Sequence, residues 1–360
     1  MIPVYMPSIG AKEKEYVNDC LDTSWVSSKG KYIGLFEASF AKFIGANHAL
    51  SVSNGTVALH LALEALNIGP GDEVIVPTYT YVASVNAIKY VGATPVYIDS
   101  NEDSIQLDAS QLEGALSNRT KAVMAVHLYG QAAPMKEISQ FCEANSLKLI
   151  EDCAEAVGTQ VGNIHVGSFG DIATFSFFGN KTITTGEGGM VVTNDPDLNE
   201  SVYRLKTQGV DPKREYWHDR LAYNYRMTNI SAAIGYAQMQ RINETLQKKK
   251  AVARFYEEHL LGLPLKTHKE QKGTTHSFWM CSLLLDDPSK RLALREHLKS
   301  FGIETRPFFH PSHTLPHLRE EKCYPVAEKL GASGLNLPSY PELTKAQLLF
   351  IAEKVRAFFA

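Results

Sequence analysis

The sequence has few cysteines, and none of them has the spacing of a metal site. Five cysteines, an odd number, are scattered along 360 residues without a CxxC pair: Cys20, Cys142, Cys153, Cys281 and Cys323. Disulfide-rich secreted scaffolds pair their cysteines, and zinc sites group them. We therefore expect reduced thiols, a cytoplasmic protein, and neither a disulfide framework nor a metal site.

Long apolar runs and strong charge are also lacking. No apolar stretch approaches the length of a membrane span. The first ten residues, MIPVYMPSIG, lack the basic and apolar regions of a signal peptide, so we expect none. A formal net charge of -3 gives no electrostatic case for nucleic acid or an anionic membrane as a partner. Neither a Walker loop nor a GxGxxG fingerprint occurs.

What the sequence does contain is a repeated alternation of strands and helices. Helical patterns separate most of the apolar runs, which predicts an α/β fold with a mostly parallel sheet covered on both faces. No helical pattern separates the last two runs, so we expect an antiparallel pair among them. The seven predicted strands are 49–53, 73–76, 94–98, 122–128, 147–150, 172–178 and 190–193.

The pattern changes after Asp195-Pro196, and from about Leu261 short strands and helices predict a second, smaller unit. We place a large domain at 1–245 and a smaller α+β domain at 246–360. The run Lys248-Lys249-Lys250 is interpreted as a solvated helix face. The elements predicted in this part are a long helix, a strand and two further helices: 231–254, 277–285, 291–301 and 344–359.

Two of the early strands end in segments suited to a planar, phosphorylated ligand. In open α/β sheets, ligands bind beyond the carboxyl ends of the strands. Ser53-Asn54-Gly55-Thr56 opens a helix there, and free amides at a helix N-terminus can hold a phosphate, although an ordinary N-cap has the same composition. Pro77-Thr78-Tyr79-Thr80-Tyr81 offers either a ring for stacking or tyrosines for the core.

Two later strands end in a carboxylate and an amine. A carboxylate within Glu151-Asp152-Cys153-Ala154-Glu155 needs a cationic partner, either a salt bridge or a protonated ring nitrogen. Lys181 lies in the turn SFFGNKTITTGEGGM, where it is either a hairpin tip or a desolvated amine able to form a Schiff base. Together the four strand ends supply what pyridoxal phosphate needs: a phosphate anchor, a ring cover, a pyridinium partner and an amine.

The same segments resemble the nucleotide-sugar aminotransferase family, pyridoxal-phosphate enzymes of the aspartate-aminotransferase fold. The resemblance covers essentially the whole chain. It implies the type I fold of these enzymes, with a seven-stranded, mostly parallel sheet in a large domain and a smaller C-terminal domain. The matching segments are SNGTVAL (53–59), PTYTYVAS (77–84), EDCAEAVG (151–158), FSFFGNKTITTGEGG (175–189) and YNYRMTNISAAIG (223–235).

The resemblance implies a role for each matching residue. Lys181 would form the Schiff base with the cofactor and then move protons, while Asp152 would keep the pyridine nitrogen protonated. Asn224 would reach the cofactor phosphate of the partner subunit, which implies a homodimer with active sites at the interface. Many relatives have glutamine or histidine at the position of Glu155, which would lie near the phenolic oxygen. The other implied cofactor contacts are Tyr81 for the ring and Gly55, Thr56 and Ser176 for the phosphate.

The substrate is implied by resemblance alone. The segment FFGNKTITTGEGG resembles members that move an amino group from L-glutamate to C4 of GDP-4-keto-6-deoxymannose. Lysine at 181, where a related dehydratase has histidine, favours amino transfer. Ser28, His310 and His313 are expected near the sugar nucleotide, and Pro311 argues against a metal site in their loop. The alternatives are amination of a UDP- or dTDP-linked keto-sugar at C3 or C4, and a non-catalytic regulator on the same scaffold.

Overall fold

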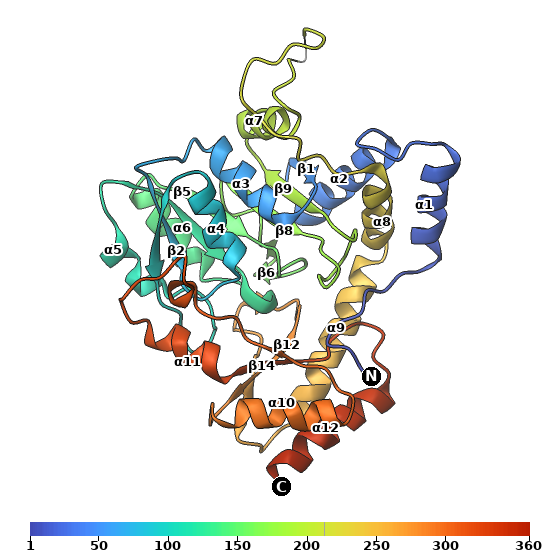
Figure 1. Cartoon of the computed structure of the whole chain (residues 1–360), viewed down its shortest axis with the longest axis vertical. Helices are drawn as coiled ribbons and strands as arrows, with labels where there is room; N and C mark the ends of the chain where they lie inside the picture. The colour runs from blue at the N-terminus through green and yellow to red at the C-terminus, as the bar shows by residue number, and fades with distance from the viewer. Residues whose placement is uncertain (212) are drawn as a thin grey trace.

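The computed structural model, which describes residues 1–211 and 213–360, is built around a seven-stranded sheet (Figure 1). Strand β9 pairs antiparallel with both β1 and β8, and the other neighbouring strands pair in parallel. This confirms the mostly parallel sheet and the expected antiparallel pair. In sheet order the strands are β1 (His48–Val52), β9 (Gly189–Thr193), β8 (Ile172–Ser176), β5 (Lys148–Asp152), β4 (Thr120–Val126), β2 (Glu73–Pro77) and β3 (Thr94–Ile98).

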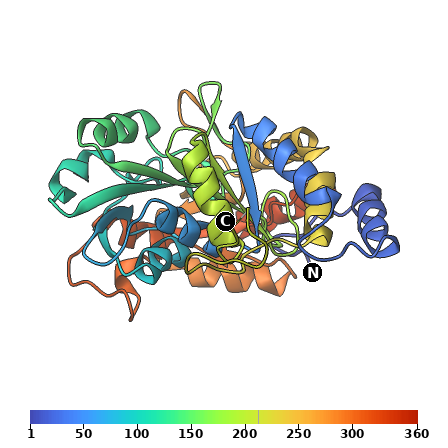
Figure 2. The ribbon, with the colours of Figure 1, turned by 90° about the horizontal axis from the view of Figure 1, so that it is seen from above.

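Helices cover both faces of this sheet (Figure 2). Successive residues of a strand point to opposite faces, so Val74 and Val76 enter one apolar core while Ile75 enters the other. One face carries α3 (Gly55–Ala65), α4 (Val82–Tyr90) and α7 (Pro196–Lys206), and the other carries α2 (Lys31–Ile44), α5 (Leu112–Ala115), α6 (Met135–Ala144) and α8 (Asn229–Met239). In the described part of the chain, no helix combines the length and the apolar character needed to cross a membrane.

A second, antiparallel sheet lies at the other end of the molecule, beside α10 (Lys290–Ser300) and α12 (Lys345–Phe359) (Figure 1). The N-terminal segment joins it, because Val4 O accepts a hydrogen bond from Ser339 N at 3.1 Å. The division of the chain at residue 245 stays a prediction. The strands, in order, are β10 (Leu265–Thr267), β12 (Cys281–Leu285), β14 (Gly334–Leu337) and β13 (Arg306–Pro307).

The remaining elements are short or lie at the edges. Helix α1 (Ala11–Asp22) packs against α8, and α11 (Pro325–Ser333) lies beside the second sheet. A small third sheet consists of β11 (Thr274–Thr275), β6 (Gln160–Val161) and β7 (Ile164–His165). The described residues also form three 3-10 turns: η1 (Ala109–Gln111), η2 (Leu128–Gly130) and η3 (Ser312–Thr314).

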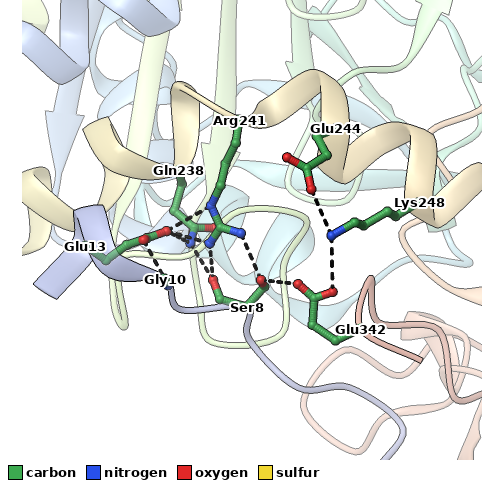
Figure 3. A network of polar contacts seen from close by, with 8 residues as sticks. All are labelled: Ser8, Gly10, Glu13, Gln238, Arg241, Glu244, Lys248 and Glu342. Atoms are coloured by element: carbon green, nitrogen blue, oxygen red, sulfur yellow. Dashed lines mark hydrogen bonds and ion pairs between the residues drawn. The ribbon is translucent and has the colours of Figure 1, made fainter. Parts of the chain in front are cut away.

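The single helix predicted over 231–254 is wrong. The chain forms α8 and then α9 (Ile242–His259), with a break at Gln240 and Arg241. At the break, Arg241 donates to the carboxylate of Glu13 and to Ser8, both in the N-terminal segment (Figure 3). Gln238 donates to the same carboxylate at 2.7 Å. The apolar periodicity continues across the break, so the pattern contains no signal for it.

The interpretation of the lysine run as a solvated face is wrong for Lys249. Lys248 pairs with Glu244 at 2.9 Å and Lys250 pairs with Glu270 at 2.9 Å, both near the surface. The side chain of Lys249 is fully buried, with 0% exposure. Residues one position apart on a helix point in directions 100° apart, so one lysine of the three enters the core.

Candidate active site

Lys181 follows β8 in a turn, and its side chain is only 12% exposed. Its Nζ lies 3.6 Å from Glu155 Oε1 and 4.0 Å from the centroid of the Trp279 ring. Desolvation lowers the pKa of Lys181, and the charges of Glu155 and Asp152 oppose that shift. A larger share of the amine is therefore neutral, the form that attacks a carbonyl carbon.

The main chain around Lys181 is held by two aromatic side chains. Tyr5 donates its hydroxyl to Lys181 O at 2.6 Å, and Trp279 donates its indole N–H to Asn180 O at 2.7 Å. Lys181 N donates to Phe178 O at 2.9 Å, which closes the turn. These bonds fix the position from which the lysine side chain extends.

Glu155 is the nearest carboxylate to the lysine amine. Its Oε2 accepts a hydrogen bond from Tyr129 N at 2.8 Å, and the side chain is buried. Desolvation raises the pKa of Glu155 to about 7, although Lys181 lowers it. Burial thus moves the pKa values of Glu155 and Lys181 toward each other, since it raises the first and lowers the second.

Asp152 ends β5, and its carboxylate is fixed in direction. Oδ2 accepts from Ser84 Oγ at 2.7 Å, and Oδ1 accepts from Ala154 N at 3.1 Å. The side chain is buried, and Ser84 in turn lies 3.0 Å from Thr80 Oγ1. Such a carboxylate suits a cationic ring nitrogen, because its oxygens are oriented before a ligand arrives.

The start of α3 forms a cradle against the end of β8. A Cβ on Gly55 would lie 2.8 Å from the Cβ of Ser176, so only glycine fits this approach without a shift. Asn54 caps the helix by accepting from Val57 N at 3.0 Å. The first N–H groups of a helix have no intrahelical partner, so those of Gly55 and Thr56 are available to an anion.

An aromatic wall lies beside Lys181, formed by Trp279, Tyr129, Phe308 and Phe309. Tyr129 stacks parallel to Trp279, with centroids 6.0 Å apart, and packs on both phenylalanines. Tyr81 lies 5.4 Å from Phe309, and its side chain is 55% exposed. An exposed ring at the start of α4 is free to cover a planar ligand.

These features fit pyridoxal phosphate. Besides the amine, the carboxylate and the cradle, two buried polar atoms beside the lysine, Asn180 Oδ1 and Thr182 Oγ1, have no hydrogen-bond partner within the described chain. Buried polar atoms normally have a partner, so these two are consistent with a polar ligand next to Lys181.

The residues predicted to contact substrate lie in different surroundings. His313 is buried, with Nδ1 2.7 Å from Thr78 Oγ1 and Nε2 3.3 Å from Glu328 Oε1. It therefore links the end of β2 to α11 and has no ring nitrogen left for a sugar. His310 is exposed, and Ser28 is half-buried in the loop before α2. Neither forms a hydrogen bond to Lys181 in the described residues.

Asn224 lies after α7, where it pairs with Thr207 in an antiparallel bridge, two residues before Arg226 pairs with Val52 at the end of β1. Its side chain is exposed, and Oδ1 accepts from Arg226 Nε at 2.9 Å. Within the described residues of one chain it forms no hydrogen bond to Lys181, Asp152 or Ser176. Its predicted contact with the partner's cofactor stays a prediction.

A buried trio with metal-ligand atoms, His127, Glu151 and Cys153, lies behind Asp152. The three ligand atoms lie within 4.8 Å of one another. His127 Nδ1 accepts from Ala133 N at 3.0 Å, so Nε2 carries the proton and donates to Glu151 at 3.1 Å. The carboxylate also accepts three backbone N–H bonds, from Gly167, Phe169 and Gly170. Hydrogen bonds thus use the His127 and Glu151 atoms that a metal would need.

Sequence reasoning missed Trp279, Tyr5 and Ser84 as parts of this site. Tyr5 reaches Lys181 from the N-terminal segment and Trp279 reaches it from the C-terminal part of the chain, while Ser84 reaches Asp152 across 68 residues. Ser84 lies inside the matching segment PTYTYVAS, so its place four residues after Thr80 on α4 was an available signal. Nothing local marks Tyr5 or Trp279.

Comparison with known proteins identifies the family. The chain matches the DegT/DnrJ/EryC1/StrS aminotransferase family over residues 7–356. It is 52% identical over 360 residues to a GDP-perosamine synthase of Escherichia coli O157:H7, covering 100% of this chain and 99% of that protein. It is 50% identical over 364 residues to a GDP-perosamine synthase of Vibrio cholerae, with coverage of 100% and 99%.

A solved structure shares both the fold and the cofactor. The PLP form of a putative sugar aminotransferase, Spr1654 of Streptococcus pneumoniae, superposes with a TM-score of 0.93 at 26% identity, covering 99% of this chain and 98% of that one. The fold class, the amino-transfer activity and the cofactor expected from the sequence are therefore confirmed. The chain belongs to the DegT/DnrJ/EryC1/StrS aminotransferase family and is a pyridoxal-phosphate-dependent aminotransferase.

Proposed function

We propose that this aminotransferase moves an amino group from L-glutamate to C4 of GDP-4-keto-6-deoxy-D-mannose, giving GDP-perosamine (GDP-4-amino-4,6-dideoxymannose). The observation that carries the chemistry is the placement of the Lys181 amine between Glu155 and the Trp279 ring. The choice of sugar nucleotide is supported by the name of two relatives that match the full chain at 50% identity or more.

The cofactor, when bound, supplies an electron sink that allows an amino group to pass between two carbonyl compounds in two half-reactions. Lys181 would hold the cofactor aldehyde and move protons at its Nζ. Asp152 would keep a proton on the ring nitrogen, since its oxygens are already oriented by Ser84 and Ala154. Glu155, 3.6 Å from the amine, can accept a proton from Lys181 Nζ or return one.

Other residues bind and shield the cofactor in this proposal. Gly55, Thr56 and Ser176 would hold its phosphate at the start of α3, and Tyr81 would cover the ring. The aromatic wall keeps water from one side of the lysine, which favours the neutral amine. The histidines of the 306–313 loop are not needed for these steps.

We further propose that the enzyme is a homodimer, with Asn224 of each chain completing the partner's phosphate site. The support is that Asn224 is exposed and, among the described residues, forms no hydrogen bond to the site of its own chain. We also expect it to work in the cytoplasm, where its free cysteines stay reduced; four of the five are buried. Sedimentation of the loaded enzyme tests the dimer, and a monomer with full activity would contradict it.

The direct test is turnover with isotopically labelled glutamate. Enzyme loaded with pyridoxal phosphate is incubated with ¹⁵N-glutamate and, separately, GDP-, UDP- and dTDP-linked 4-keto-6-deoxy sugars and a 3-keto sugar nucleotide. We expect ¹⁵N in the amino sugar of the GDP compound, identified by mass spectrometry and by its C4 position in NMR. Lys181→Ala should abolish turnover, while Lys148→Ala, at a surface ion pair with Asp171, should not change it.

The outcomes separate the alternatives. Exclusive use of a uridine or thymidine sugar would refute the GDP assignment and keep the aminotransferase. Failure of a cofactor-loaded enzyme to exchange an amino group with glutamate would instead support a non-catalytic regulator.

A further inference from the structure

Lys249 is a buried cation that the proposed reaction does not use. Its Nζ donates to Ser339 O at 2.8 Å and to Trp279 O at 3.1 Å, and it lies 5.0 Å from the centroid of the Tyr5 ring. An ammonium has three N–H donors, so two carbonyl groups and one aromatic face satisfy it. Among the described residues, no carboxylate lies within ion-pair distance of Lys249.

Holding a cation here costs stability. Desolvation lowers the pKa of Lys249 to about 8, and Cys281 acts in the other direction. A buried charge without a counter-ion is costly, and even a buried ion pair can often be replaced by apolar residues of similar volume without loss of stability. Methionine would fill nearly the same volume, so packing alone does not explain a lysine at this position.

Two of the groups that Lys249 contacts are the two that hold Lys181. Trp279 places its ring 4.0 Å from Lys181 Nζ and donates to Asn180 O. Tyr5 donates its hydroxyl to Lys181 O. The third contact, Ser339, also fastens the N-terminal segment, because Ser339 N donates to Val4 O, next to Tyr5.

We infer that Lys249 is a positioning residue of the active site: its buried ammonium holds Trp279 and Tyr5, and these two side chains set the place and direction of the Lys181 amine. Trp279 needs such an anchor, because Phe278 before it has a left-handed φ of 51° and the strand β12 begins only at Cys281. The strand predicted over 277–285 is therefore wrong at its start, because β12 begins at Cys281. The inference rests on the proposed role of Lys181 and is independent of the sugar substrate.

The test replaces Lys249 by methionine and reads Trp279 and the reaction of Lys181 separately. Trp25 and Trp217, both exposed at 55% and 45%, are first changed to phenylalanine so that Trp279 is the remaining tryptophan. In this background, Lys249→Met should shift the Trp279 emission to longer wavelength and raise its quenching by acrylamide. Lys248→Met, at the partly exposed neighbour on the same helix, is the matched control and should leave both unchanged.

The kinetic readout is the half-reaction of the loaded enzyme with glutamate, followed by the loss of its visible absorbance in a single turnover. We expect Lys249→Met to slow the rate constant about ten-fold or more, with little change in the glutamate concentration for half-maximal rate. The melting temperature should not fall by an amount that would account for the slower reaction, because the substitution removes a buried charge. A loss of stability alone would point to a purely structural lysine and would overturn the inference.

A second variant keeps the inference testable if Lys249→Met does not fold. Tyr5→Phe removes one hydroxyl and leaves Lys249 in place, and it should slow the same half-reaction several-fold. Unchanged kinetics in Tyr5→Phe, or equal kinetics in Lys249→Met and Lys248→Met, would overturn the inference. If the parent enzyme itself fails to react with glutamate, the proposed function fails, so the two failures are distinguishable.

Discussion

The hydrogen bonds of the buried Glu151 carboxylate, next to Asp152 in the sequence, lead to a quantitative prediction about the stability of the large sheet. Oε1 accepts from Phe169 N at 2.8 Å and from Gly170 N at 2.7 Å. Oε2 accepts from Gly167 N at 2.8 Å and from His127 Nε2 at 3.1 Å. Four donors thus converge on one fully buried carboxylate. Glu151→Gln keeps the volume and shape but replaces one acceptor oxygen by an NH₂ group.

Either orientation of the glutamine places its NH₂ group against two N–H donors. Rotation of His127 does not relieve this, because its other ring nitrogen accepts from Ala133 N. Two hydrogen bonds to a charged group are lost, each worth about 1.5–3 kcal/mol, so the free energy of unfolding should fall by about 3–6 kcal/mol. For a chain of this size we expect the melting temperature to fall by roughly 4–8 °C.

Thermal and urea unfolding of the cofactor-free protein measure this effect. Glu143→Gln makes the same chemical change at an exposed position near the end of α6 and should leave the unfolding midpoint within about 1 °C. A destabilisation of Glu151→Gln below about 1 kcal/mol would refute the reasoning. Stabilisation of the native protein by zinc, reversed by a chelator, would show instead that His127, Glu151 and Cys153 hold a metal.

Three further changes test the site and the fold. Gly55→Ala brings a Cβ to 2.8 Å from its neighbour and should weaken pyridoxal phosphate binding by about 1–3 kcal/mol, measured by absorbance titration, while Gly34→Ala, with open space around it, should not. Ser84→Ala removes the 2.7 Å bond to Asp152 and should slow the glutamate half-reaction roughly ten-fold; a rate within two-fold would argue against an orienting role. Burial lowers the pKa of His268 from 6.5 to about 4, so its contribution to stability is present above pH 6.5 and is lost as the pH falls toward 4. In urea unfolding across that range, His268→Gln should lose about 3 kcal/mol less than the parent protein, and equal pH slopes would contradict this assignment.

The strand ends of the large sheet were predictable because each signal is local. A short apolar run followed by a polar residue marks the end of a buried strand, and the parallel order brings those ends to one edge. Asp152 and Ser176 each end a strand of the large sheet, and the ends of their strands are neighbours. The fold brings Gly55, which follows β1, against Ser176. No local sequence pattern predicts that contact.

Other features had no local signal. The break between α8 and α9 depends on Arg241 finding Glu13, 228 residues earlier. The ring of His313 is buried against Thr78, 235 residues away, and the predicted substrate contacts of its loop stay a prediction. In both cases the residue type alone is compatible with a surface position, and a partner far away in the sequence decides whether the side chain is buried.

The sequence by itself determined the class of the enzyme, since a lysine, an aspartate and a glycine-led helix start each follow a strand in a recognisable pattern. The tertiary structure decided how the lysine is held. Tyr5 meets Lys181 across 176 residues, and Lys249 meets Ser339 across 90. Hydrogen bonds and burial at such separations depend on chain packing that periodicity does not encode, so a lysine expected in solvent became a buried anchor behind the active site.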